Sequence, residues 1–75
     1  MNRSPENMHL KKLGEKIRQI RLDKHLSQEQ LAHICGFDRT YISLVERAKR
    51  NLSFSNLCTF ARALGVTVST LTKDI

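Results

Sequence analysis

Apolar residues along the chain recur at three- and four-residue steps, which is the spacing of one face of an α-helix. The first such stripe begins at Leu10 and indicates a helix that ends near Lys24 or His25. Its apolar members are Leu10, Leu13, Ile17 and Ile20. We find neither a strand hairpin nor an internal repeat in the sequence. The pattern therefore predicts an all-α fold.

Three later helix starts share one signature, a capping residue flanked by two apolar residues. Ser27, Asp38 and Ser53 can each cap a helix with a side-chain oxygen. In each case the residue before the cap can contact the fourth helical residue as a hydrophobic staple. The staple pairs are Leu26 with Leu31, Phe37 with Ile42, and Leu52 with Leu57. These signals predict helices over residues 28–35, 39–46 and 54–64.

The last part of the chain predicts one more helix. Gly65 provides the stop that ends the fourth helix. Thr67 can then cap a short fifth helix that carries Val68 and Leu71.

Composition limits the architecture and suggests the kind of partner. A chain of 75 residues, 40% of them apolar, suffices for one small domain. We expect a flexible segment over residues 1–8 and a single domain over 9–75. Thirteen Lys and Arg against seven Asp and Glu leave a net charge of +6, which favours polyanionic partners such as nucleic acid or an acidic membrane surface. We expect no enzyme, because so small a chain leaves little room for a catalytic cleft and no nucleophile–base pair is visible.

Other chemistry is disfavoured by what the sequence lacks. Cys35 and Cys58 are interpreted as small buried apolar residues, not as a disulfide framework or redox pair. The histidines are scattered and C-x-x-C is absent, so we expect no metal and no cofactor. No apolar run is long enough to span a membrane, and the N-terminal segment lacks the apolar stretch of a signal peptide. We therefore expect a cytoplasmic protein without membrane contact.

The second and third predicted helices have the spacing of a helix-turn-helix. Only about three residues separate them, the length of connection that this motif uses. Ala32 is small where two helices would cross, and Gly36 tolerates the positive φ of the turn. Ile42 and Val45 would bury the second helix against the first. Together, at fixed offsets between two capped starts, these residues are a strong signal.

At this level of detail, residues 13 to about 71 resemble the phage repressor/Cro-like (XRE-type) helix-turn-helix family. The matching pieces are LGEKIRQIR, LSQEQLA, DRTYISLVER and ALGVTVSTL. The resemblance implies a compact, five-helix, lambda-repressor-like DNA-binding domain with the helix-turn-helix at its second and third helices. The segment FDRTYISLVERAKRNLS most resembles controller proteins of restriction–modification systems, which are small dimeric regulators acting on their own promoter.

The resemblance implies a function in transcription regulation and a set of partners. These are double-stranded DNA with a palindromic operator and a second copy of the chain. A phage-type repressor and the antitoxin of a toxin–antitoxin pair are the alternatives. No small-molecule effector is expected, because no second domain is present to hold one.

The same resemblance assigns roles to individual residues. Chemistry supports DNA contacts at these positions, because a recognition helix meets base edges with its N-terminal residues while flanking basic groups bind phosphates. The expected DNA-binding residues are Gln28, Arg39, Thr40, Tyr41, Ser43, Arg47, Lys49, Arg50, Asn51 and Arg21. Arg39 can bond guanine bidentately, whereas Tyr41 has packing inside the protein as an alternative. Arg18 and Glu46 are expected to form a structural ion pair.

The sequence also leads to expectations for residues outside the predicted DNA-binding set. Apolar residues that exceed the needs of a small core predict a dimer interface at Val66, Val68 and Leu71. Asp38 is interpreted as a cap rather than a base contact. The first helix carries lysines that we interpret as a solvated face, at positions Lys11, Lys12 and Lys16. Ala48 and Leu52 depart from the Gly and Pro common in the family. The resemblance therefore predicts the positions of residues 49–51 less exactly than those of the helices.

Overall fold

The computed structural model describes residues 5–75, with side chains described from Met8 onward. Its described part contains five α-helices: α1 (Pro5–Asp23), α2 (Gln28–Cys35), α3 (Arg39–Glu46), α4 (Phe54–Leu64) and α5 (Val68–Thr72). The all-α prediction is confirmed, and α2, α3 and α4 have the predicted bounds. α1 begins at Pro5, inside the segment predicted to be flexible, because proline suits the first position of a helix. Residues 1–4 of that segment lie outside the described residues.

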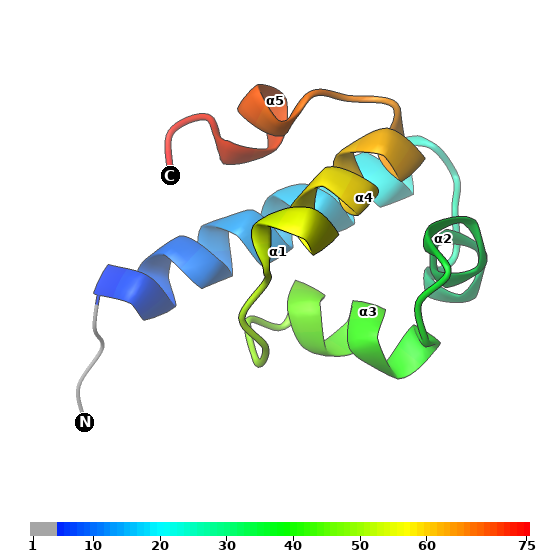
Figure 1. Cartoon of the computed structure of the whole chain (residues 1–75), viewed down its shortest axis with the longest axis horizontal. Coiled ribbons are helices and arrows are strands. Elements are labelled where there is room, and N and C mark those ends of the chain that lie inside the picture. Colours follow the sequence, from blue (N-terminus) through cyan, green and yellow to red (C-terminus); the bar gives the residue numbers. More distant parts are fainter. Residues whose placement is uncertain (1–4) are drawn as a thin grey trace.

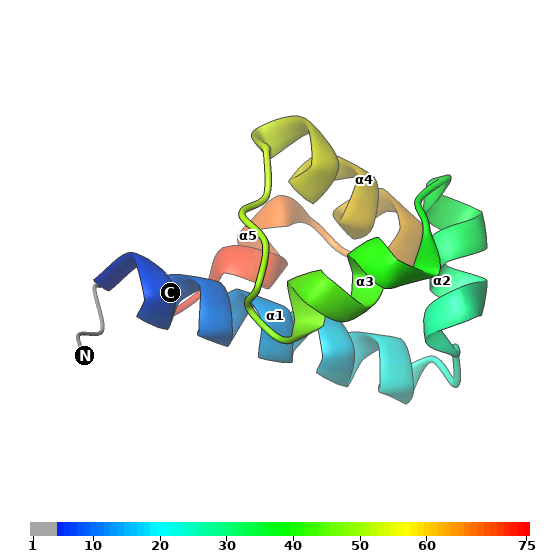
Figure 2. The same cartoon turned by 90° about the horizontal axis from the view of Figure 1, so that it is seen from below.

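α1 is the long element against which the others are arranged. In Figure 1, α3 lies along one side of α1 and α5 along the other, while α4 lies in front of the second half of α1. α2 packs on α3 and α4 at the far end of α1. Figure 2, seen from below, shows α3 in front of α4 and the loop after α3 returning past α1. α3 therefore packs against α1 and α2, while one of its faces remains free.

The core is formed by apolar residues from all five helices. Its buried members are Leu13, Ile17, Leu31, Ala32, Ile42, Val45, Phe60, Ala61, Leu64 and Leu71. Phe60 is fully buried, and its ring lies 5.3 Å from that of Phe37. Leu71 is also fully buried. The prediction that Leu71 forms a dimer surface is therefore wrong, because α5 uses this side chain to close the core of the single chain.

The caps of the helices follow the sequence signals with one exception. The side chains of Ser27, Ser53 and Thr67 each accept a hydrogen bond from the backbone of the first turn that follows. Asp38 has the extended backbone of a cap, but its side chain makes no capping hydrogen bond. Gly65 ends α4 in the left-handed conformation with φ 71°, as predicted. The exposed carboxylate of Asp38 is thus left on the surface at the start of α3.

Candidate nucleic-acid interface

The turn between α2 and α3 brings two short helices into contact. Gly36 has a φ of 76°, a left-handed conformation that costs glycine little. The amide of Phe37 donates to the Ala32 carbonyl oxygen at 2.9 Å and closes the end of α2. Ala32, Ile42 and Val45 are buried where the two helices pack. The helix-turn-helix predicted from these offsets is confirmed.

One face of α3 is turned to solvent. Arg39, Ser43 and Arg47 follow one another at four-residue steps along this face, with Thr40 beside Arg39. Ser43 is half-buried, and the other three are exposed. Arg47 Nε donates to Ser43 Oγ across 3.3 Å. The outer face therefore carries hydroxyl and guanidinium groups, which can hydrogen-bond to base edges and phosphates.

Beside this face, the last turn of α3 carries a buried carboxylate, Glu46, which is held by Arg21 of α1. Arg21 donates from Nε to one oxygen of Glu46 at 2.6 Å and from Nη2 to the other at 3.0 Å. Its Nη1 donates to the Leu26 carbonyl oxygen at 2.8 Å. The side chains of Arg21 and Glu46 are only 7% and 2% exposed, respectively. This pair joins α1, the loop before α2, and the end of α3.

Two sequence predictions about the arginines of α1 are wrong. The expected partner of Glu46 is Arg18, but Arg18 is exposed and Arg21 forms the pair. Arg21 follows Gly14 by seven residues, or two helical turns, so both lie on the side of α1 that faces α3. Arg18 lies about 100° further around than Ile17, on the solvent side. Because Arg21 is buried, it supports α3 and does not offer its charge to a phosphate.

Gln28 links the buried pair to the surface of α3. Its Nε2 donates to Glu46 Oε1 at 3.1 Å, and its Oε1 accepts from Arg39 Nη1 at 3.2 Å. A continuous chain of hydrogen bonds thus runs from Arg21 through Glu46 and Gln28 to Arg39. A guanidinium already held in one place loses less side-chain entropy when it binds. In this state the Gln28 amide, expected to contact phosphate, donates one of its two N–H groups to Glu46 and accepts from Arg39.

Tyr41 packs inward more than it projects outward. Its ring meets Phe37 edge-on, with centroids 4.9 Å apart, and its hydroxyl accepts a hydrogen bond from Asn56 Nδ2 at 3.0 Å. The guanidinium of Arg50 lies 5.5 Å from the ring centroid, a cation–π distance. In the isolated chain, Tyr41 therefore packs inside the protein, which is the alternative considered from the sequence. A contact between Tyr41 and DNA stays a prediction. Asn56, which the sequence did not single out, fixes the hydroxyl.

The loop after α3 makes a tight turn through a strained residue. Ala48 has a φ of 61°, where a Cβ is disfavoured. The turn is closed by the amide of Lys49, which donates to the Leu44 carbonyl oxygen at 2.8 Å. Lys49, Arg50 and Asn51 are exposed beyond it. Alanine thus adopts the positive φ for which the resemblance implied a glycine.

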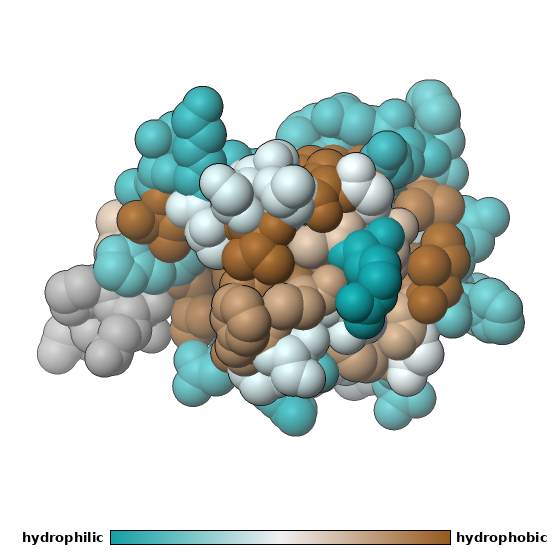
Figure 3. Space-filling model, turned by 45° about the horizontal axis from the view of Figure 1, so that its top comes forward, coloured by the Kyte–Doolittle hydropathy of each residue, from teal (hydrophilic) through white to brown (hydrophobic). Residues whose placement is uncertain are grey.

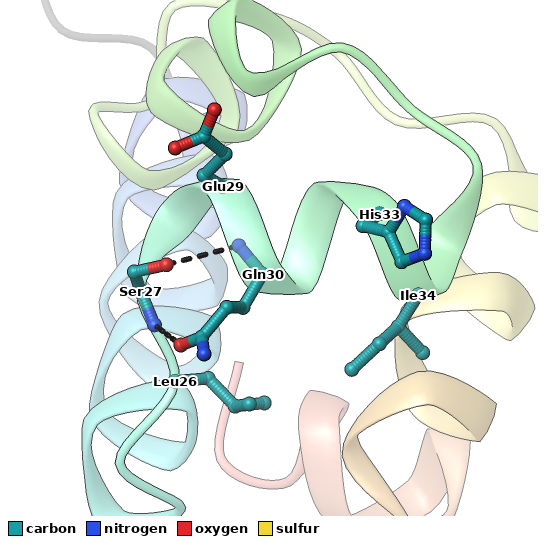
Figure 4. A pocket seen from close by; sticks show the side chains of 6 residues that line it. All are labelled: Leu26, Ser27, Glu29, Gln30, His33 and Ile34. Atoms are coloured by element: carbon teal, nitrogen blue, oxygen red, sulfur yellow. Dashed lines mark hydrogen bonds between the residues drawn. The ribbon is translucent and has the colours of Figure 1, made fainter.

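A shallow hollow on α2 lies away from this surface. Figure 4 shows the side chains that line it: Leu26, Ser27, Glu29, Gln30, His33 and Ile34. Two of them form the capping box, in which Gln30 N donates to Ser27 Oγ at 2.9 Å and Ser27 N to Gln30 Oε1 at 2.8 Å. Gln30 follows Gln28 by two residues, which places it on the opposite side of the helix. The hollow is therefore separate from the α3 surface.

The groups that could support metal or thiol chemistry are few. Among the side chains that the structure describes, no three His, Cys, Asp or Glu residues lie close enough to hold a metal ion. Cys35 and Cys58 are free and half-buried. Burial raises the pKa of the Cys35 thiol to about 11, which lowers its reactivity as a nucleophile or ligand. No helix within residues 5–75 is both long and apolar enough to cross a bilayer.

The sequence contained signals for two residues whose roles were missed. A Cβ added to Gly14 would lie 2.5 Å from the Val45 carbonyl oxygen and 2.8 Å from that of Glu46. Gly14 therefore permits the backbone of α1 to approach the end of α3. Its spacing from Arg21 identifies the face of α1 that meets α3, and this spacing would have selected Arg21 over Arg18.

The geometry described above is that of a helix-turn-helix protein, and comparison with known proteins agrees. The profile of the helix-turn-helix family matches residues 17–71, most of the chain. The chain belongs to this family. Restriction–modification controller proteins are among the proteins to which the chain is similar.

Control protein C.BamHI of Bacillus amyloliquefaciens is 54% identical over 54 residues, which cover 71% of this chain and 67% of the relative. The crystal structure of the restriction–modification controller protein C.AhdI from Aeromonas hydrophila superposes with a TM-score of 0.81 at 44% identity, covering 83% of this chain and 94% of that one. A structure of the nucleoprotein complex of C.Esp1396I gives a TM-score of 0.76 at 40% identity, covering 83% and 80% of the two chains. The predicted family and fold are confirmed.

Proposed function

We propose that this protein is a sequence-specific regulator of transcription that binds double-stranded DNA through α3. The observation that carries the proposal is the chain of hydrogen bonds that ends on Arg39. It holds an exposed guanidinium at the start of a helix whose last turn is anchored by the Arg21–Glu46 pair. Such a group is suited to bond guanine O6 and N7 in the major groove.

The proposed contacts divide into two groups. Arg39, Thr40 and Ser43 face the bases from the first turns of α3. The cations of the following loop bind phosphates, which adds affinity without sequence preference. Gln28 remains a candidate phosphate contact, because its Nε2 has a second N–H beside the one that it donates to Glu46. Tyr41 supports Arg50 and lies close enough to the surface to meet the sugar–phosphate backbone.

We propose further that the protein acts as the controller of a restriction–modification system on its own promoter. The relatives described above support this role over that of a phage-type repressor or an antitoxin. Such a regulator works in the cytoplasm, where the chromosome lies. Its activity would follow its own concentration, without a small-molecule effector.

A homodimer completes the proposal. One recognition helix covers about four base pairs, so two copies on half-sites roughly 34 Å apart would provide the length that a unique site needs. The surface of α4 and α5, which comes forward in Figure 3, shows apolar groups among polar ones. Phe54 is 71% exposed, and Val66 and Val68 are half-buried. We propose that these three residues pair across a two-fold axis.

Footprinting on the DNA upstream of the protein's own gene tests the regulator. We expect the wild type to protect two half-sites, and Arg39→Ala to lose that protection with a cost of about 1–3 kcal/mol. Wild-type protein that protects no site would contradict the proposal. For the dimer, sedimentation should show weaker association of Phe54→Ser than of Ile34→Ser, a matched loss of an exposed apolar group on α2. Equal association of both variants would exclude Phe54 from the interface.

A further inference from the structure

The three lysines on the first half of α1 have different surroundings. Lys16 Nζ lies 3.4 Å from the Thr70 carbonyl oxygen and so belongs to the packing of α5. Lys12 lines a hollow next to the last residues of the chain, Lys73–Ile75. Lys11 instead lines a hollow with the end of α3 and the loop that follows it. The solvated face expected from the sequence therefore consists of three distinct positions.

The position of Lys11 follows from the close contact between α1 and α3. Gly14 brings the backbone of α1 against the last carbonyl groups of α3. Lys11 precedes Gly14 by three residues, or nearly one turn, and so lies over the chain that leaves α3. The chain turns at Ala48, and Lys49 lines the same hollow. Two segments far apart in the sequence thus share one basic hollow.

The charges around this hollow are unbalanced. Lys11, Arg47 and Lys49 line it with two carboxylates, Glu15 and Glu46. Glu46 is already paired with Arg21, so its charge is neutralised within the protein. Among the side chains that the structure describes, the Arg21–Glu46 contact is the one ion pair within 4.0 Å. Three exposed cations therefore face solvent here against the single exposed carboxylate of Glu15.

We propose that Lys11 binds a phosphate of the DNA backbone, extending the phosphate contacts of the loop after α3 onto α1. This inference rests on the proposed function. The hollow adjoins the end of α3 opposite to the base-contacting Arg39, where the helix would leave the groove and the backbone of the duplex would pass. A cation on a flexible stem suits a phosphate, whose recognition requires charge more than fixed geometry. Lys12, although adjacent in sequence, faces the chain end and makes no such contact.

The test is the salt dependence of DNA binding by Lys11→Ala, with Lys12→Ala as the matched control. Both variants remove one exposed lysine from the same helix, so the change in net charge is identical. Two probes are used, a duplex carrying the half-sites protected in footprinting and a random 30-base-pair duplex. Each phosphate contact contributes about 0.9 to the slope of log affinity against log salt concentration. Because a dimer makes the contact twice, we expect the slope of Lys11→Ala on the protected duplex to be smaller by about 2.

Each outcome decides the proposal. A reduced slope in Lys11→Ala, an unchanged one in Lys12→Ala, and recovery in Lys11→Arg support it. Equal slopes in the wild type and Lys11→Ala would overturn it. Equal reductions in both alanine variants would also overturn it, because they would show that the slope depends on the net charge of the protein and not on a phosphate contact at Lys11. Unchanged thermal unfolding of Lys11→Ala excludes a folding defect. If the wild type binds neither duplex in a salt-dependent manner, the proposed function fails together with this inference; specific binding with equal slopes overturns the inference alone.

Discussion

Arg21 and Glu46 form a bidentate pair in which two guanidinium N–H groups meet both carboxylate oxygens, at 2.6 and 3.0 Å. The two residues belong to different helices and are 25 positions apart. Because both are buried, neither charge has water as an alternative partner. α3 is thus fixed to α1 by a directional contact in addition to apolar packing.

Removing one partner of this pair should destabilise the fold strongly. In Glu46→Ala, the guanidinium of Arg21 stays buried without its counter-charge, which costs about 3–5 kcal/mol in comparable pairs. Urea denaturation measures the change in the free energy of unfolding. Glu29→Ala, an exposed carboxylate on α2, serves as the control and should shift it by less than about 0.5 kcal/mol. A similar small shift in both variants would show that the buried pair contributes little.

The strained turn after α3 predicts a stabilising substitution. Ala48 has φ 61°, where a Cβ costs about 1–2 kcal/mol, while glycine costs about 0.5–1 kcal/mol more entropy on folding. Ala48→Gly should therefore raise the free energy of unfolding by about 0.5–1 kcal/mol. Gly36→Ala is the mirror experiment: it should be destabilising by conformation alone, because a Cβ there meets nothing within 4 Å. Calorimetry that gave both changes the same sign would refute this account of the two turns.

Substitution of Gly14 by alanine should destabilise the protein, although alanine has the higher helix propensity. In an exposed helix, Gly→Ala stabilises by about 1 kcal/mol. Here the added Cβ would lie 2.5 Å from the Val45 carbonyl oxygen, so α1 and α3 must separate. We expect Gly14→Ala to lower the free energy of unfolding by about 1–3 kcal/mol, the usual cost of overpacking. A more stable variant in chemical denaturation would mean that the two helices are not in close contact.

Cys35 should behave as an unreactive thiol. Burial raises its pKa to about 11, so the reactive thiolate is scarce at pH 8. In Cys58→Ser, where Cys35 is the single thiol, alkylation by iodoacetamide should be roughly a hundredfold slower than that of free cysteine. Because the pKa is raised, the rate should still increase above pH 10. A plateau near pH 9 would instead indicate an exposed, ordinary thiol.

Short-range sequence signals predict the helices of this protein well. Capping residues and staple pairs place α2, α3 and α4 correctly because these signals act within a few residues of each helix end. The offsets of Ala32, Gly36 and Ile42 likewise predict the helix-turn-helix, whose packing is local. These features depend on neighbours along the chain and can therefore be inferred without a tertiary structure.

Contacts between distant segments were predicted less well. The resemblance indicated that Glu46 has an arginine partner, but choosing between Arg18 and Arg21 depends on how α1 rotates against α3. Leu71 looked like surplus apolar surface because the sequence does not reveal that α5 folds back onto the core. The bond between Gln28 and Arg39 joins two helix starts and has no signal of its own in the pattern.

The most direct test of base recognition by Arg39 asks which guanine of a protected half-site Arg39 contacts. Each guanine is replaced in turn by 7-deazaguanine, which lacks the N7 acceptor, and affinities are measured for the wild type and Arg39→Ala. At one position the wild type should lose about 1–3 kcal/mol of binding free energy, whereas Arg39→Ala should be indifferent to that replacement. Losses of equal size in both proteins at every guanine would contradict the claim that Arg39 on α3 recognises a base.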